Sequence, residues 1–215
     1  MSNIDLPVVT NRISILVVDD HPLLRAGLRD TIADQLDMHV VGEAADGDEA
    51  VRLFARHRPE VTIMDVAMPG MDGVQALLAI RAMAPGARVV MLTTFNGDVQ
   101  IRRAIDAGAA GFLLKSSVRK NLLDTIRDVH AGRRCIAPEI AQELARNIGA
   151  ASLTEREIAV LRRVALGNAN KRIAVELAIA EETVKSHMRS ILDKLDANDR
   201  THAVTIALKR GIIAL

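Results

Sequence analysis

Five residues that could bind a cation and stabilise a phosphoryl group each follow a short apolar stretch of the chain. They are, in chain order, Asp19 and Asp20 after ISILVV, Asp65 after VTIM, Thr93 after VVML and Lys115 after GFLL. Carboxylates that lie close together repel one another unless a cation joins them. Oxygen ligands without His or Cys favour a hard ion, most simply Mg²⁺. The lysine and the hydroxyl would then provide the positive charge and the hydrogen bond that a phosphorylated carboxylate needs.

These residues meet only if the apolar stretches are neighbouring strands of one sheet. Alternation of apolar runs with amphipathic stretches predicts strands at 13–18, 39–43, 61–65, 88–92 and 111–114. Five strand–helix units in strict alternation predict an α/β domain with a parallel sheet covered on both faces. Ligands of such sheets bind outside the carboxyl ends of the strands, where these polar residues fall.

The helices between the strands have clear sequence signals. Pro22 suits a first helical position, and apolar residues then recur every fourth position, at Leu24, Leu28, Ile32 and Leu36. Further helices are predicted at 48–57, 74–83, 99–107 and 118–131. No strand is predicted after Gly132. Beyond it we predict a helix at 137–148, a hinge at 149–152, and helices at 155–165, 171–177, 182–195 and 201–210, which together indicate a small all-α domain.

Composition narrows the class of protein. The net charge is +1, no apolar stretch approaches the roughly 20 residues of a membrane helix, and the N-terminus lacks the pattern of a signal peptide. The single Cys135 excludes an intramolecular disulfide and a thiolate metal site, which favours a cytoplasmic location. The absence of Trp and Tyr argues against base stacking on aromatic platforms. A mildly basic tail suggests nucleic acid as a partner for the second part.

The motifs LVVDDHPLLRAGL, IMDVAMPGMDG, VVMLTT and AGFLLK resemble those of the receiver domain of bacterial two-component response regulators. The resemblance implies a flavodoxin-like five-stranded sheet of order 2-1-3-4-5, over 11–131. It implies that Asp65 accepts a phosphoryl group from a sensor histidine kinase, and that Asp19, Asp20, Asp65 and the backbone carbonyl of Ala67 bind Mg²⁺. It further implies that Thr93, Phe112 and Lys115 stabilise or respond to the phosphoryl group.

An enzyme alternative uses similar chemistry. Haloacid-dehalogenase-like phosphatases also combine an Asp nucleophile with Mg²⁺ at a sheet edge. In their motif, Asp-x-Asp, the second Asp acts as the general acid and base. Here the second position is Ala67, which cannot transfer a proton. We therefore expect a protein that is not an enzyme.

The tail has its own family resemblance. LTEREIAVL, GNANKRIA, EETVKSHMRSILDKL and DRTHAV resemble the LuxR-type DNA-binding domain, over 152–215, with 132–151 as a linker that contains one helix. Two of its helices have helix-turn-helix spacing, and Val184, Met188, Ile191 and Leu195 are predicted to point inward. The resemblance makes Lys185, Ser186 and Arg189 the base-facing residues. It makes Thr183, His187, Asn170, Lys171, Lys194 and Arg200 candidates for contacts to the DNA backbone.

Together the two parts resemble the NarL/FixJ subfamily of transcriptional regulators. The expected function is phosphorylation-controlled, sequence-specific binding to double-stranded DNA, with a homodimer as the active form and RNA polymerase as a further partner. Two alternatives stay open: a regulator that binds DNA independently of phosphorylation, and a module that binds other proteins.

Overall fold

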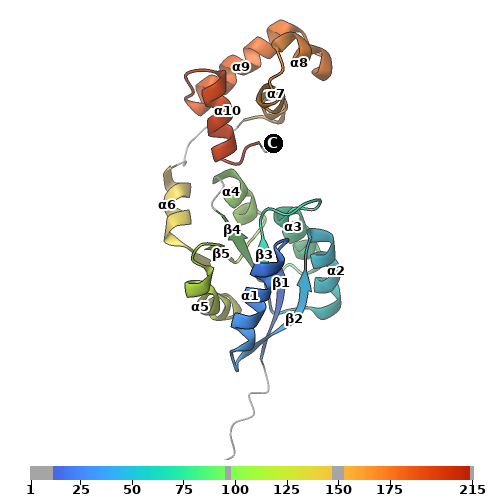
Figure 1. The fold of residues 1–215 in the computed structure, drawn as a ribbon, viewed down its shortest axis with the longest axis vertical. Coiled ribbons are helices and arrows are strands. Elements are labelled where there is room, and N and C mark those ends of the chain that lie inside the picture. The colour runs from blue at the N-terminus through green and yellow to red at the C-terminus, as the bar shows by residue number, and fades with distance from the viewer. Residues whose placement is uncertain (1–11, 95–97, 147–152, 214–215) are drawn as a thin grey trace, which may run out of the picture. The chain divides into compact units, whose positions relative to one another are not determined.

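The computed structural model describes residues 12–94, 98–146 and 153–213. The chain forms two compact units, one built on a parallel sheet and one made of helices (Figure 1). No described helix has both the length and the apolar character needed to cross a membrane. The predicted hinge at 149–152 lies outside the described residues, and the domain boundaries 11–131, 132–151 and 152–215 stay a prediction.

The first unit alternates strands and helices as predicted. The strands are β1 (Ile13–Val18), β2 (Met38–Ala44), β3 (Val61–Asp65), β4 (Val89–Thr93), β5 (Gly111–Leu114) and β6 (Cys135–Ile136). They pair in the order β2-β1-β3-β4-β5-β6, and every pair is parallel. The helices between and after them are α1 (Pro22–Ala33), α2 (Gly47–His57), α3 (Gly73–Met83), α4 (Asp98–Asp106), α5 (Val118–His130) and α6 (Pro138–Arg146).

The order 2-1-3-4-5 is confirmed, and β6 corrects the prediction that no strand follows Gly132. Cys135 pairs with Gly111 and Ile136 with Phe112, so β6 extends the sheet beyond β5. Two residues are too few to show a periodic pattern, which is why the sequence did not reveal this strand.

The sheet is covered on both faces, and its central strands β1, β3 and β4 are buried along almost their whole length. Alternate residues of β1 point to opposite faces. Its odd-numbered residues, Ile13, Ile15 and Val17, pack in a core with side chains of α1 and α5. Leu16 and Val18 are also buried, as are apolar side chains of α2, α3 and α4. In α1, Leu28 and Ile32 are buried as predicted, whereas Leu36 lies beyond the end of the helix and is 87% exposed.

The C-terminal domain consists of four helices: α7 (Glu155–Ala165), α8 (Asn170–Leu177), α9 (Glu181–Leu195) and α10 (Arg200–Lys209). Thr154 begins α7 in a capping box with Glu157. The turn between α8 and α9 starts at Ala178, which has a left-handed backbone. Of the α9 residues predicted to point inward, Val184, Ile191 and Leu195 are buried and Met188 packs against them.

Candidate functional site

The acidic cluster

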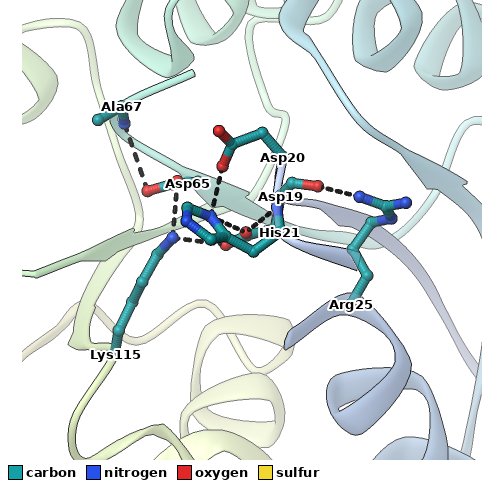
Figure 2. Close-up of polar contacts among 7 residues, drawn as sticks. All are labelled: Asp19, Asp20, His21, Arg25, Asp65, Ala67 and Lys115. Carbon is teal, nitrogen blue, oxygen red and sulfur yellow. Dashed lines mark hydrogen bonds and ion pairs between the residues drawn. The ribbon is translucent and has the colours of Figure 1, made fainter. Parts of the chain in front are cut away.

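The predicted carboxylates come together at the carboxyl ends of the central strands. Asp19 directly follows β1, Asp65 is the last residue of β3, and the two strands are paired. Lys115 directly follows β5, and its backbone N–H donates to the Thr93 carbonyl at the end of β4, at 2.8 Å. The parallel register thus brings residues that are 50 and more positions apart into one site (Figure 2).

Lys115 joins two carboxylates. Its Nζ lies 2.8 Å from Asp19 Oδ2 and 2.7 Å from Asp65 Oδ2. Asp19 is fully buried and Asp65 is 3% exposed, so the two negative charges are held in a poorly solvated place. Burial is the main reason why the pKa of Asp65 is raised, with Asp19 adding to the effect and Lys115 opposing it. The pKa of Lys115 is also raised: burial lowers it, but its hydrogen bonds to both carboxylates outweigh that effect.

His21 and Arg25 complete the surroundings and were not among the predicted site residues. The His21 N–H donates to Asp19 Oδ1 at 2.9 Å, and its ring Nδ1 lies 2.6 Å from Asp20 Oδ1. Arg25 Nη1 donates to the Asp19 carbonyl at 2.5 Å. Figure 2 shows that both residues approach the two adjacent aspartates from the start of α1. The position of His21 directly after Asp19-Asp20 was the only sequence signal for these two neighbours of the cluster. The contact of Arg25 depends on the path of the turn into α1, which the sequence pattern does not show.

The loop after Asp65 passes close to that residue because Gly73 has no side chain. A Cβ on Gly73, the first residue of α3, would lie 1.9 Å from the Asp65 carbonyl oxygen. The Gly73 N–H instead donates to the Val66 carbonyl at 3.0 Å. Within the loop, the Ala67 N–H donates to Asp65 Oδ1 at 3.3 Å. The absence of a side chain at Gly73 therefore lets α3 begin in close contact with the backbone of Asp65.

The donor set fits a hard divalent cation. One ligand atom from each of Asp19, Asp20, His21 and Asp65 lies within 4.8 Å of the others. Asp19 Oδ2 and Asp20 Oδ1 are buried and make no hydrogen bond of normal geometry with the described residues, although each has a nitrogen at ion-pair distance. Buried carboxylate oxygens of this kind suit Mg²⁺ or a similar ion.

Two predicted switch residues, Thr93 and Phe112, and the predicted metal ligand Ala67 differ in their surroundings. Thr93 ends β4 and is 6% exposed. Phe112 is 1% exposed and lies in the sheet opposite Met91 and Ile136. Ala67 is exposed, and its amide, rather than its carbonyl, is the group that contacts Asp65. The roles of all three stay predictions.

The helix-turn-helix surface

Most of the predicted DNA-contacting side chains are accessible. Of the base-facing residues on α9, Lys185, Ser186 and Arg189 are all exposed. Lys185 makes an ion pair with Glu182 at 3.1 Å, one turn earlier on the same helix. Among the residues predicted to contact the backbone, Thr183, Lys171 and Arg200 are exposed, while His187 and Asn170 are partly buried.

Lys194 has a partner inside its own domain. Its Nζ lies 2.9 and 2.8 Å from the two carboxylate oxygens of Glu157, which is 4% exposed. Ser190 donates to the same carboxylate at 2.7 Å, and Thr154 donates to it from both its backbone N–H and its hydroxyl. Although burial alone would raise it, these hydrogen bonds lower the pKa of Glu157 to about 2. Lys194 therefore fastens α9 to the start of α7.

Arg200 also makes an internal contact, from the start of α10. Its Nη2 donates to the carbonyl of Asn168, which follows α7, at 3.0 Å. The side chain nevertheless stays exposed, so this contact fixes its position without removing it from the surface.

Comparison with known proteins

An acidic site on a five-unit parallel α/β domain, followed by a helix-turn-helix domain, defines a signal receiver joined to a DNA-binding module. Residues 15–127 match the response regulator receiver domain, and residues 151–207 match the luxR family of bacterial regulatory proteins. The chain therefore belongs to the two-component response regulators of the NarL/FixJ subfamily, a family of transcription factors and not of enzymes.

Relatives match nearly the whole chain. The uncharacterized transcriptional regulatory protein YxjL of Bacillus subtilis (strain 168) is 38% identical over 214 residues, covering 94% of this chain and 98% of YxjL. The response regulator protein VraR of Staphylococcus aureus is 36% identical over 206 residues, covering 94% and 99%. A solved structure of two RcsB dimers bound to two parallel DNAs is 25% identical, with a TM-score of 0.68, and covers 91% of this chain and 98% of that chain.

Proposed function

We propose that Asp65 is the phosphoacceptor of this response regulator and that its phosphorylation by a sensor histidine kinase controls dimerisation and sequence-specific DNA binding. The observation that carries the proposal is the Lys115 ammonium, which lies within 2.8 Å of both Asp19 and Asp65. A cation fixed beside a buried carboxylate stabilises the negative charge that a phosphoryl group brings to the site.

The transfer follows from the groups present. A carboxylate oxygen of Asp65 attacks the phosphorus of the kinase's phosphohistidine, the P–N bond breaks, and the imidazole keeps the electron pair and takes up a proton. Asp65 then carries an acyl phosphate, and Lys115 is placed to pair with one of its oxygens. Asp19, Asp20, Asp65 and the Ala67 carbonyl would hold Mg²⁺, which when bound neutralises phosphoryl oxygens. The Ala67 N–H, already 3.3 Å from Asp65, adds a donor.

The response would pass through β4 and β5. Thr93 ends β4, and its hydroxyl can hydrogen-bond a phosphoryl oxygen, while Phe112 on β5 would respond to that movement. The changed surface would favour the homodimer, and two recognition helices would then read paired half-sites in the major groove. RcsB dimers are bound to DNA in a solved structure, which supports the same assembly here. We place this activity in the cytoplasm, with RNA polymerase as a further partner.

The predicted DNA-contacting residues fall into two groups, those that would read bases and those that would contact phosphates. Arg189 can address a guanine bidentately, and Lys185 and Ser186 can reach neighbouring base edges. Thr183, His187, Asn170, Lys171 and Arg200 would contact phosphates and set the affinity. Lys194, whose ammonium is bound to Glu157, would act through the orientation of α9 or reach a phosphate only after leaving that partner.

The test compares the wild type with Asp65→Asn, each with and without acetyl phosphate and Mg²⁺. Phosphoryl incorporation is followed by intact-protein mass, and binding by retardation of genomic DNA fragments. We expect a gain of one phosphoryl group and tighter DNA binding only in the wild type. Asp48→Asn, an exposed aspartate in the first turn of α2, is the matched control and should behave as the wild type.

Three other results would contradict parts of the proposal. Equal DNA binding by both proteins under all conditions would leave a regulator that works independently of phosphorylation. Phosphoryl incorporation into Asp65→Asn would move the acceptor to another residue. Failure to bind any fragment would instead favour a module that binds other proteins.

A further inference from the structure

A second polar cavity lies at the edge of the sheet opposite the acidic cluster. It has a volume of about 180 Å³ and is lined by residues that precede the amino ends of β4, β5 and β6, together with the ends of α3 and α5. Four of its ten lining residues are arginines, and none is an aspartate or a glutamate: Arg81, Gly86, Ala87, Arg88, Gly108, Ala110, Val129, Gly132, Arg133 and Arg134.

Two of the arginines are held by contacts within the domain. Arg81 Nη1 donates to the Ala87 carbonyl at 3.4 Å, which ties the last turn of α3 to the loop before β4. Arg133 makes an ion pair with Asp128, one turn before the end of α5. These contacts explain the positions of Arg81 and Arg133 without a ligand.

The other two arginines have no such explanation. Within the described parts of the chain, Arg88 and Arg134 have no hydrogen bond or ion pair from their side chains, although both line the cavity. Arg88 is partly buried, and its side chain pairs with no carboxylate among the described residues. Positive charges that gather without a counter-charge repel one another, and an anion placed between them removes that repulsion.

Glycines keep the cavity open. Added Cβ atoms on Gly86 and Gly132 would meet nothing within 4 Å, so the space beside them is empty. A Cβ on Gly108 would lie 3.1 Å from the Arg81 guanidinium, so the absence of a side chain there lets Arg81 lie across the backbone. Glycines therefore leave space in the wall of the cavity, and the arginines give the cavity its positive charge.

We propose that this cavity binds a diphosphate group, with Arg88 and Arg134 as its principal ligands. Guanidinium groups bind phosphate oxygens in a bidentate manner, and two free ones match the two phosphates. Cavities that enclose whole organic ligands are usually about 300 Å³ or larger. This cavity suits the diphosphate itself, free or at the end of a nucleotide whose base stays outside. The site would give the receiver an input that does not pass through Asp65.

The test is calorimetric titration of the full-length protein with pyrophosphate and, separately, with ADP, in the absence of Mg²⁺. The double variant Arg88→Gln/Arg134→Gln should bind pyrophosphate at least tenfold more weakly than the wild type. The control Arg56→Gln removes an exposed arginine from the last turn of α2 and should bind as the wild type does. Asp65→Asn should also bind as the wild type does, which separates this site from phosphorylation.

The two probes distinguish the sources of the anion. Tighter binding of ADP than of pyrophosphate assigns the site to a nucleotide, and the reverse assigns it to free diphosphate. If the double variant does not keep the wild-type circular dichroism spectrum, Arg134→Gln alone replaces it, because Arg134 is exposed and should still lose affinity severalfold.

Four results would overturn the proposal. These are no binding by the wild type, equal binding by the double variant, loss of binding in Asp65→Asn, and sulfate binding as tight as that of pyrophosphate. If equal pyrophosphate binding by the double variant is accompanied by a loss of DNA affinity, the arginines are identified as contacts to nucleic acid.

Discussion

Lys115 shows at the residue scale how this site is prepared for a phosphoryl group. Without its ammonium, the buried carboxylates of Asp19 and Asp65 would face each other with no positive charge between them. Removing one partner from a buried set of this kind costs about 3–5 kcal/mol, because the remaining charges stay buried and uncompensated. The same charge that the phosphorylated protein would use therefore already contributes to the stability of the unphosphorylated fold.

Replacement of two glycines by alanine should change the free energy of unfolding in opposite directions. Gly73→Ala should lower the free energy of unfolding by about 3 kcal/mol or more, because the new Cβ meets backbone that has no room to move. Gly27→Ala should raise it by roughly 0.5–1 kcal/mol, because its Cβ meets nothing within 4 Å and alanine favours the interior of α1. Urea unfolding followed by circular dichroism measures both, and equal effects of the two substitutions would contradict the packing at Gly73.

Much of the site was predictable at this scale, and some of it was not. Aspartates and a lysine at the ends of apolar runs predicted the acidic cluster, because parallel strands place their carboxyl ends at one edge of the sheet. The sequence did not reveal His21 and Arg25 as neighbours of Asp19, since both depend on the path of the turn into α1. Lys194 was predicted as a contact to the DNA backbone, and its bond to a buried glutamate on another helix has no local sequence signal.

At the scale of elements, regular strands and helices were predictable and short or terminal ones were not. The first five strands and the helices between them follow from the sequence pattern. The two-residue β6 does not, because its existence depends on pairing with β5. Leu36 continued the apolar spacing of α1, yet the helix ends at Ala33, and the leucine is exposed. Periodicity alone therefore could not say where the helix stops.

Glu157 links α7 to α9, and this link should depend on pH. Its pKa of about 2 is below the usual value of 4.5, so its stabilisation is complete above pH 4.5 and is lost as the pH falls toward 2. The difference corresponds to on the order of 3 kcal/mol. Amide hydrogen exchange of α9 should show this loss in the wild type. Glu157→Gln should be less protected at pH 7 and show little further change between pH 4.5 and 2; a parallel decline in both proteins would contradict the link.

Substitutions on the helix-turn-helix should separate base reading from phosphate contact. On an operator selected from random sequences, Arg189→Ala should cost about 1–3 kcal/mol and relax the preference at one base pair. Lys171→Ala should weaken all sequences alike and reduce the slope of log affinity against log salt by about 1. Lys209→Ala, an exposed cation on α10, is the control. Equal losses on selected and unrelated DNA for Arg189→Ala would remove its base-reading role.

For the whole molecule, the proposed function couples two equilibria, phosphorylation and DNA binding. A tenfold gain in DNA affinity on phosphorylation needs only about 1.4 kcal/mol of difference between the two states. By reciprocity, operator DNA should then favour the phosphorylated form by the same factor.

Thr93→Ala should break this coupling while sparing the chemistry. Asp65 and Lys115 stay in place, so acetyl phosphate should still phosphorylate the variant. Without the hydroxyl at the end of β4, the gain in DNA affinity and in dimer should fall at least severalfold. Phosphate-affinity gels measure the modified fraction, and sedimentation and DNA retardation measure the response. A variant that is fully phosphorylated and binds DNA as tightly as the phosphorylated wild type would show that the signal takes another route.

The short strand β6 also determines where the chain leaves the sheet. It joins the sheet through two residues only, directly before α6, so the polypeptide leaves the sheet from the shortest of the described strands. Under tension β6 would detach before any other strand and leave the five-stranded sheet intact. Residues 132–137 would then be released, and six extended residues span about 20 Å. Detachment of β6 would therefore move the point at which the chain leaves the sheet from Ile136 back to the end of α5, by up to that length.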